Sequence, residues 1–224
     1  MKEHFNRAII NLKQMAAQMA ADAEDALAKA VHAVSVRDTQ LAQCVLEGDY
    51  RIDCEEIKIE EECLKILALY QPVASDLRTV VTILKVNIEI ERIADMACNI
   101  AERVADMAQF ELESTPELQF DCTEMAEGAR EMLRFALDSM TYRDPELAER
   151  VIRSDDVIDA MNRQNFAWAK ERMATHPEFC GYLLDCLTIS KSFERIADVV
   201  TNICEDVIYL ERGKIIRHGN VAKS

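Results

Sequence analysis

Apolar side chains near the start of the chain recur at intervals of three, four, seven or eight residues. Such intervals place side chains on one face of an α-helix, so the pattern predicts a long first helix with one buried face. The residues that define this face are Phe5, Ile9, Leu12, Met19, Leu27, Val31 and Val34.

Interruptions of the apolar pattern separate the next two helices. Pro72 ends one of them, because proline cannot continue a helix, and Asp38, Ser75 and Asp76 are candidate N-caps. The predicted second helix therefore runs from Asp38 to about Tyr70, and the predicted third helix runs from Ser75 or Asp76 to about Ala108.

A similar arrangement follows a short linker, QFELEST, at 109–115. Thr115-Pro116-Glu117 and Asp144-Pro145-Glu146 each place a capping residue before a proline and an acid, which is typical of a helix N-terminus. They predict the starts of the fourth and fifth helices. His176-Pro177 separates the fifth helix from a sixth, which ends before Gly213 because glycine favours the position after a helix.

One phrase occurs twice along the chain and reveals a duplication. ERIADMACNIAERV at 91–104 and ERIADVVTNICEDV at 194–207 share nine of fourteen residues. With no segment alternating like a strand, the predicted fold is all-α: two tandem three-helix antiparallel bundles made of six long helices. The predicted limits are 1–108 for the first repeat, 109–216 for the second and 217–224 for a short tail.

Composition narrows the classes of partner. The formal charge of −15 opposes binding to nucleic acid or to anionic membrane surfaces, and it favours cations and basic patches on other proteins. No apolar run approaches the ~20 residues needed to cross a bilayer. The eight cysteines form no CxxC motif, and no signal peptide is evident. Reduced thiols in a cytoplasmic protein are therefore expected, with thiol chemistry or soft-metal binding as the alternative.

The repeated phrase also carries acidic residues in a fixed arrangement. At about 100° per residue, Glu91 and Asp95 share a helix face with Asn99 and Glu102. The second copy repeats this arrangement with Glu194, Asp198 and Asn202. The opposite face of the first copy is apolar and predicts the core through Ile93, Met96, Ala97, Ile100 and Val104.

A second set of acids lies on the middle helix of each half, at Asp49 and Asp53 and at Asp155 and Asp159. In an antiparallel bundle each pair can approach the Glu and Asp of the next helix. Four carboxylates and an amide would then converge, and such hard oxygen ligands suit Mg²⁺, Ca²⁺, Mn²⁺ or iron. The alternative is a solvated acidic face, on which like charges four residues apart cost roughly 0.2–0.5 kcal/mol per pair.

The acidic face of the third and sixth helices is apolar one to four turns earlier, which predicts a docking surface beside the acids. Its residues are Leu77, Val80, Val81, Leu84 and Ile88 in the first half, and Cys180, Leu183, Leu184, Leu187 and Lys191 in the second, where four of the five are apolar.

Other catalytic patterns do not occur in the sequence. It contains no GxxxxGK[ST] loop, no GxGxxG and no HExxH, and none of its four histidines completes an ExxH. We therefore predict a protein that is not an enzyme. A metal-dependent hydrolase or oxidase that uses the acids is the alternative.

Several motifs together resemble the PhoU family of bacterial phosphate-transport regulators. They are VLEGDYRID at 45–53, QPVASDLR at 71–78, the two ERIAD phrases and the ending GKIIRH at 213–218, in the family's order and separation. The resemblance implies two similar three-helix bundles. It also implies a cytoplasmic negative regulator of the phosphate-starvation response that modulates phosphate uptake.

The resemblance further implies partners and ligands. Family members are thought to connect the ATPase subunit of a phosphate ABC transporter to a sensor histidine kinase, and they often form homodimers. In some members the E/D-xxx-D motifs bind iron or other metals, and in others they remain empty. The candidate metals here are iron, magnesium, manganese and zinc, and the matching residues are Asp49, Asp53, Glu91, Asp95, Asn99, Asp155, Asp159, Glu194, Asp198 and Asn202. Ala94 and Ala197 replace the family's usual glycine, which adds a methyl group beside the acids.

Overall fold

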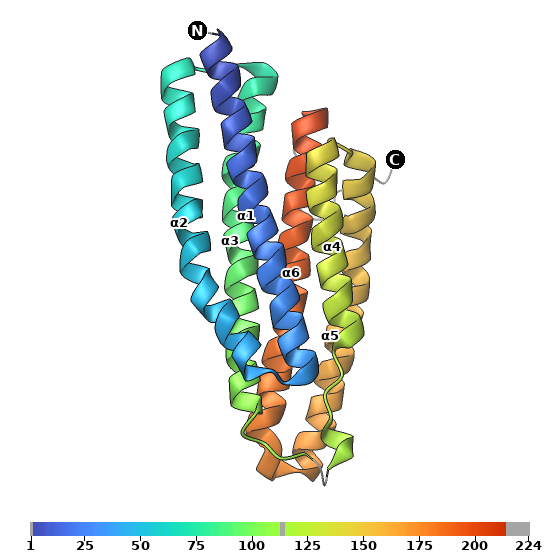
Figure 1. Cartoon of the computed structure of the whole chain (residues 1–224). Coiled ribbons are helices and arrows are strands. Elements are labelled where there is room, and N and C mark those ends of the chain that lie inside the picture. Colours follow the sequence, from blue (N-terminus) through green and yellow to red (C-terminus); the bar gives the residue numbers. More distant parts are fainter. Residues whose placement is uncertain (1, 113–114, 214–224) are drawn as a thin grey trace.

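The computed structural model describes residues 2–112 and 115–213. All regular secondary structure in these ranges is helical, which confirms the predicted all-α class (Figure 1). The long helices are α1 (Lys2–Val36), α2 (Thr39–Tyr70), α3 (Ala74–Met107), α4 (Thr123–Tyr142), α5 (Pro145–Thr175) and α6 (Cys180–Arg212), with short 3₁₀ turns η1 (Pro116–Leu118) and η2 (Pro177–Phe179).

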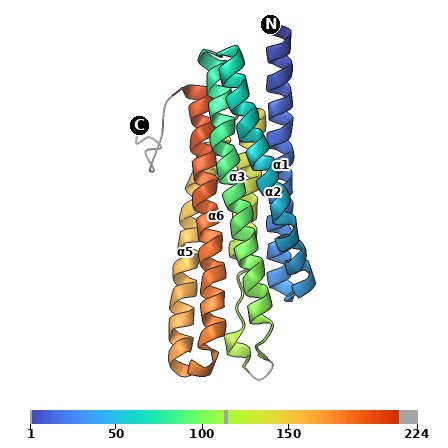
Figure 2. The same cartoon turned by 90° about the vertical axis from the view of Figure 1, so that its left-hand side faces the viewer.

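The helices form two three-helix antiparallel bundles that pack side by side. The first contains α1, α2 and α3, and the second contains α4, α5 and α6. In both views α3 and α6 lie next to each other in the middle, and in Figure 1 α2 and α5 lie at opposite edges (Figures 1 and 2). The predicted duplication is therefore visible as two similar units joined mainly through α3 and α6.

The core runs along the inner faces of α3 and α6. In α3 the apolar residues of the repeated phrase are buried as predicted, namely Ile93, Met96, Ala97, Ile100 and Val104. Their counterparts in α6 are buried too, namely Ile196, Val199, Val200, Ile203 and Val207. Because each helix presents apolar residues at helical spacing, both can bury one face in the centre of the molecule.

Ion pairs border the contact between α3 and α6. The Nζ atom of Lys85 lies 2.5 Å from Oδ1 of Asp206, and Nη1 of Arg103 lies 3.6 Å from Oδ1 of Asp185. The earlier α3 residue pairs with the later α6 residue, as antiparallel helices require. Since these pairs are partly exposed, they contribute little free energy but favour one register over others.

The QPVASDLR segment connects α2 to α3 and also reaches α6. Gln71 ends α2 in the left-handed region, with φ of 46°, and Pro72 prevents continuation of the helix. The Nε atom of Arg78 then donates to the carbonyl oxygen of Leu210 at 3.3 Å. The carbonyl groups in the last turn of a helix have no N–H donor within that helix. Arg78 therefore supplies a donor to one such carbonyl group of α6.

Two of the predicted N-caps are confirmed by hydrogen bonds. The Oδ1 atom of Asp38 accepts from the backbone N–H groups of Gln40 and Leu41, both at 2.9 Å. The Oδ1 atom of Asp144 accepts from the N–H of Leu147 at 2.9 Å. These bonds satisfy amide groups that have no partner inside the helix.

The predicted start of the fourth helix was wrong. Thr115-Pro116-Glu117 leads only into η1, and Gln119 returns to extended backbone with ψ of 120°. The helix begins at Thr123, whose N–H is accepted by Oδ1 of Asp121 at 3.0 Å. Leu118 is fully buried, so packing of the connection against the core stops the first turn from continuing.

The predicted caps of the third helix, Ser75 or Asp76, were also wrong, by two or three residues. Val73 is the N-cap, and it makes no side-chain capping hydrogen bond. At the other end of the chain, Gly213 follows α6 with φ of 67°, and its N–H donates to the carbonyl oxygen of Tyr209, as predicted for that position. The predicted tail at 217–224 and most of the GKIIRH motif lie outside the described residues.

Within the described ranges no helix is long and apolar enough to cross a membrane.

Replacing the confirmed cap should cost more than replacing the acid that makes no cap. We expect Asp38→Ala to lower the free energy of unfolding by about 1 kcal/mol, because two amide groups lose their acceptor. Asp76→Ala in the first turn of α3 should cost only about 0.3 kcal/mol through the helix dipole. Urea unfolding followed by circular dichroism measures both values, and equal losses would contradict this assignment of caps.

Candidate metal centres

The first group of predicted acids lies along the seam between α2 and α3. Asp49 and Asp53 are one turn apart on α2, and Glu91 and Asp95 are one turn apart on α3. Each of Asp53, Glu91 and Asp95 feels the charge of acids on the facing or same helix. The bundle therefore brings the four predicted carboxylates of the first repeat together, and we name them the first acidic cluster.

Burial and mutual repulsion both act on the first acidic cluster. Burial raises the pKa of Glu91, and the charges of Asp95, Asp53 and Asp49 raise it further. Burial likewise raises the pKa of Asp95, with added repulsion from Asp49 and Asp53. Both effects disfavour the charged carboxylate, so an added cation would stabilise the ionised form.

The second acidic cluster consists of Asp155 and Asp159 on α5 with Glu194 and Asp198 on α6. Burial raises the pKa of Asp155 to about 6, and repulsion from Asp198, Asp159, Asp156 and Glu194 adds to this effect. The pKa of Asp198 is also raised by burial and then by Glu194. The second cluster therefore repeats the arrangement of the first.

The clusters are less exposed than a solvated face would be. Asp95 and Asp198 are exposed, but the other six carboxylates are half-buried. The reason is that α2 lies beside α3 and α5 lies beside α6, which covers the flank where the acids project. The helix-face argument correctly placed the acids away from the core, but it did not include the covering effect of the neighbouring helices.

Equivalent oxygens in the two clusters lack ordinary hydrogen bonds. Oδ1 of Asp155 is buried and accepts no hydrogen bond. Oδ1 of Asp49, at the corresponding position of the first repeat, is buried in the same way beside the thiol of Cys98. Buried acceptors without donors are uncommon and costly, and a bound cation is one means of satisfying them.

The predicted asparagines lie at the outer ends of the clusters. Asn99 and Asn202 are both exposed. The Nδ2 atom of Asn99 donates to the backbone oxygen of Asp95 at 3.0 Å, so its amide is held one turn beyond the carboxylates. The structure thus places both amides beside the acids but outside the seams.

Three further charged residues belong to these seams and were not predicted. Glu56 lies one turn after Asp53, and its Oε1 accepts from Asn87 on α3 at 3.2 Å. Lys191 pairs with Glu194 at 2.5 Å, and Arg163 pairs with Asp159 at 3.4 Å. Glu56 could have been predicted because it lies three residues after Asp53 on the same helix. The two basic residues could have been predicted because Lys191 lies three residues before Glu194 and Arg163 lies four residues after Asp159.

The two clusters therefore differ in their neutralisation. The second contains two ion pairs formed within its own helices. In the described part of the chain, the four carboxylates of the first cluster make no ion pair with a basic side chain. The first cluster keeps more uncompensated negative charge.

The donor types of both clusters fit a hard divalent cation. Carboxylate oxygens are the preferred ligands of magnesium, manganese and iron, and burial raises the pKa of the neighbouring Cys98 to about 12, so its thiol is protonated. Across residues 2–112 and 115–213, no three acidic, histidine or cysteine side chains already stand close enough to enclose an ion. Binding would therefore require the carboxylates to rotate inward.

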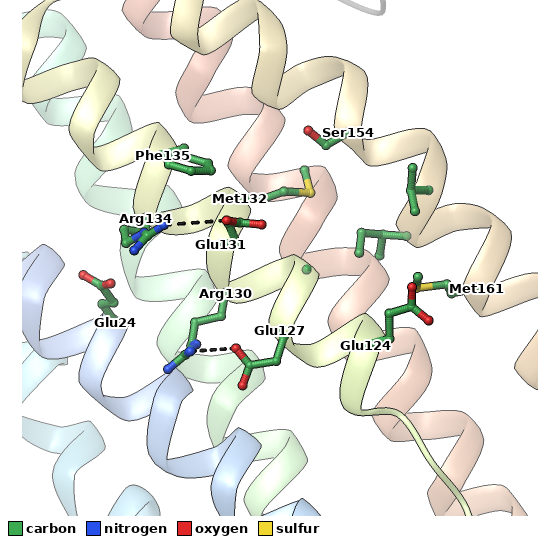
Figure 3. A pocket seen from close by; sticks show the side chains of 13 residues that line it. Glu24, Glu124, Glu127, Arg130, Glu131, Met132, Arg134, Phe135, Ser154 and Met161 are labelled. Carbon is green, nitrogen blue, oxygen red and sulfur yellow. Dashed lines mark hydrogen bonds and ion pairs between the residues drawn. The ribbon is translucent and has the colours of Figure 1, made fainter.

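A separate groove of about 700 Å³ lies between α4 and α5 and extends to α1 (Figure 3). Its acids are partly neutralised, because Arg130 pairs with Glu127 at 2.6 Å and Arg134 pairs with Glu131 at 3.6 Å. None of the predicted site residues lines this groove. The acidic clusters are therefore separate from this groove.

The predicted apolar strip on α3 and α6 divides into buried, half-buried and exposed residues, and Val81, Leu84 and Leu187 are half-buried. Val80 and Leu183 are fully buried in the core, so they cannot contact a partner. Leu77, Ile88 and Leu184 are exposed and remain available. A docking surface on these helices is therefore narrower than the sequence pattern indicated.

The fold and the two seams define a duplicated three-helix-bundle protein with paired acidic clusters. The family model described as the PhoU domain matches this chain twice, over residues 16–104 and 122–207. The chain belongs to the PhoU family.

Named relatives are similar over nearly the whole length. The phosphate-specific transport system accessory protein PhoU homolog 1 of Thermotoga maritima is 32% identical over 94% of this chain and 90% of its own length. The accessory protein PhoU of Escherichia coli is 32% identical over 96% of this chain and 88% of its own length.

Two solved structures have the same fold. The crystal structure of PhoU from Pseudomonas aeruginosa superposes with a TM-score of 0.88 at 32% identity and covers 94% of this chain and 100% of its own. The phosphate transport system regulatory protein PhoU from Streptococcus pneumoniae gives a TM-score of 0.80 at 26% identity, covering 96% and 100%.

The raised pKa of Asp155 predicts a pH-dependent stability. The folded protein holds this proton more tightly than the unfolded chain, whose pKa is near 3.8. The stabilisation is therefore complete below pH 4 and is lost as the pH rises through about 6. We expect Asp155→Asn to raise the free energy of unfolding at pH 7.5 by on the order of 1 kcal/mol after discounting for solvent screening, and to change it little at pH 4.

Urea unfolding at several pH values with a chelator present measures this difference. Asp76→Asn is the control, because Asp76 is an exposed acid on another helix and is not among the charges that raise the pKa of Asp155. A loss of stability in Asp155→Asn that is equal at every pH would contradict the role of desolvation.

Proposed function

We propose that this protein is a non-enzymatic, cytoplasmic negative regulator of the phosphate-starvation response and a modulator of phosphate uptake. It acts as an adapter between the ATPase subunit of a phosphate ABC transporter and a sensor histidine kinase. The observation that carries this proposal is the match of both repeats to proteins named as accessory proteins of a phosphate-specific transport system.

The surface proposed for docking combines apolar and acidic side chains. Leu77 and Ile88 on α3 and Leu184 on α6 are exposed, and they precede the acids Glu91 and Glu194 of the same helices in the sequence. Apolar contact supplies free energy of association, and the negative charge favours a basic patch on the partner. The chain's net charge of −15 is consistent with that preference.

A pull-down with the transporter ATPase tests this surface. We expect Leu184→Ser to reduce capture of the ATPase by roughly tenfold, because an exposed leucine at an interface contributes one to two kcal/mol, about 1.4 kcal/mol per tenfold. Ile10→Ser is the matched control, since Ile10 is similarly exposed on α1.

A cellular assay tests the regulatory role separately. In a bacterium that lacks its own PhoU protein, the parent chain should silence a phosphate-starvation reporter in phosphate-rich medium, and Leu184→Ser should do so less well. A silent reporter with Leu184→Ser together with unchanged capture of the ATPase would contradict the proposed surface.

We also propose that the acidic clusters hold divalent cations, with iron, manganese, magnesium or zinc as candidates. Asp49, Asp53, Glu91 and Asp95 would hold one site, and the second cluster would hold another. A bound cation supplies positive charge that offsets the repulsion between carboxylates. A cation bound by both helices of a seam would hold α2 to α3, or α5 to α6, so the role of the cation would be structural or sensory.

We also propose that the protein associates with itself to form a homodimer.

Cation binding should appear as a stability change. We expect Mn²⁺ at one hundred times its dissociation constant to raise the free energy of unfolding of the parent protein by about 2.7 kcal/mol for each occupied site. The double variant Glu91→Gln with Asp95→Asn should lose the contribution of the first cluster and keep that of the second, because two donors of the first cluster lose their charge. Glu102→Gln is the control, since Glu102 is an exposed acid on the same helix.

Thermal unfolding with and without Mn²⁺, together with elemental analysis of protein purified without chelator, measures this response. A parent protein whose unfolding ignores all four cations would refute the metal proposal. Metal-dependent turnover of a phosphoester would refute the non-enzymatic one.

A further inference from the structure

The outward face of α2 carries a row of exposed apolar side chains. Tyr50, Ile57 and Leu64 are seven residues apart, and their exposed fractions are 77%, 54% and 53%. A spacing of seven places them in one line along the helix. The helix α2 lies at an edge and packs against α1 and α3 (Figure 1). Because the three side chains are exposed, their line is on the side of α2 that faces away from the molecule.

The second repeat does not share this row. Asp49 and Asp53 correspond to Asp155 and Asp159, an offset that aligns the three apolar positions with Asp156, Arg163 and Lys170 on α5. The fold therefore accepts charged residues at these positions. The apolar side chains of α2 are not required for folding of the bundle, so their presence needs another reason.

The row forms part of a heptad pattern. The residues four positions after each apolar member, Cys54, Glu61 and Ala68, lie on the same face and complete a seam with intervals of four and three. In heptad terms the apolar row occupies d positions and the second row occupies a positions. Only Glu61 departs from the apolar or small character expected of such a seam.

Opposite charges flank the two sides of the seam. Arg51, Lys58 and Lys65 follow each apolar residue by one position, which is the e position of the heptad. Glu60 occupies a g position on the other side, whereas Asp53, the g residue one heptad earlier, belongs to the first acidic cluster. The two lysines pair with Glu55 at 2.6 Å and Glu62 at 3.0 Å in exposed contacts along the same helix, which are weak enough to exchange.

This charge pattern selects both the occupant and its orientation. In a parallel pair of identical helices, the g row of one helix faces the e row of the other, so acids meet lysines. In an antiparallel pair each row faces its own copy, and like charges meet. A second copy of this chain in parallel orientation is therefore complementary to the face.

We propose that α2 is a self-association surface on which a second copy of this chain packs its own α2 in parallel and in register. Glu60 then pairs with Lys65 of the second copy, and each apolar residue meets its own equivalent. This inference rests on the self-association part of the proposed function and names its surface. It does not depend on the transporter, the kinase or a metal.

Glu61 limits the strength of this dimer. In a parallel pair Glu61 faces its own copy at an a position, where two like charges oppose association. The contact is also short, since the seam spans only 50–68. The dimer should therefore dissociate on dilution, and replacing Glu61 by an apolar residue should strengthen it.

Sedimentation equilibrium on the full chain tests the surface. We expect Ile57→Ser to weaken dimerisation by roughly tenfold or more, because apolar area is lost from both copies. Glu61→Leu should strengthen it by roughly tenfold or more for the converse reason. Phe166→Ser is the matched control, since Phe166 is a similarly exposed apolar residue on α5. Circular dichroism confirms that each variant is folded.

Charge exchange tests the flanking rows. Lys65→Glu should weaken the dimer, because it places an acid opposite Glu60. The double variant Glu60→Lys with Lys65→Glu should restore it. Failure of restoration would overturn the proposed pairing.

Cross-linking tests the orientation. Cys54 meets Cys54 of the second copy only in a parallel, in-register pair, so mild oxidation with copper phenanthroline should give a covalent dimer. The exposed Cys44 and Cys180 are replaced by serine beforehand, and Cys54→Ser in that background should abolish the product. A dimer that forms without this cross-link would overturn the orientation.

Two outcomes would overturn the proposal as a whole. One is a parent chain that stays monomeric at every concentration. The other is a dimer that Ile57→Ser leaves unchanged, which would retain self-association but place it on another surface. Binding of a different protein to α2 by a chain that stays monomeric would overturn the proposal in the same way as the first outcome. None of these results alters the reporter assay, which tests the regulatory proposal independently.

Discussion

The packing of α3 against α6 is the constraint on which the rest of the structure depends. These helices carry the two copies of the repeated phrase, and each buries one apolar face in the centre of the molecule. Burial of these residues is the main source of stability, since each fully buried aliphatic side chain contributes about 1.5–3 kcal/mol before entropy is counted. Burial of that face fixes the rotation of each helix about its axis, and this rotation sets the direction of every other side chain on the helix.

The position of the acids follows from this fixed rotation. A residue two positions away from the buried face projects toward the flank of the helix, where α2 covers α3 and α5 covers α6. Glu91 and Glu194 are therefore half-buried in seams even though they are charged. Burial raises the pKa of Glu91 and of Asp155, because it disfavours the ionised carboxylate. Holding these carboxylates close together therefore costs free energy, which the packing of the core offsets. A site that gains by binding a cation is a direct consequence of the central packing.

Most of the fold was predictable from the sequence because its signals are local. Asp38 and Asp144 precede their helices and form the expected hydrogen bonds, and the repeated phrase identifies the duplication. The start of α4 was not predictable, because Thr115-Pro116-Glu117 is as good a local signal as the true start at Thr123. Its failure depends on the burial of Leu118, which is a tertiary contact.

The candidate site was predictable only in its membership. Spacing identified the eight carboxylates, but their burial and the ion pair between Lys191 and Glu194 depend on the neighbouring side chains and helices. The same limit applies to Val80 and Leu183, which helix-face reasoning assigned to an exposed strip. A rotation of a helix by a fraction of a turn decides between core and surface, and that rotation is set by what packs against it.

Packing restricts the residue types at the buried positions of the two repeats, whereas it does not restrict the exposed positions. The two repeats differ at the exposed positions. The buried positions of the repeated phrase in α3 and α6 stay apolar in both copies, whereas the outward row of α2 is apolar and that of α5 is charged. The same division appears in the seams, where Lys191 and Arg163 neutralise acids of the second cluster and the described part of the first repeat supplies no such ion pair. An uncompensated cluster gains more from a cation than a compensated one, and an exposed apolar row gains more from a partner than a charged row. The first repeat therefore has more free energy to gain from binding. In the second repeat, ion pairs with its own side chains already neutralise part of the acidic cluster, and the outward row is charged.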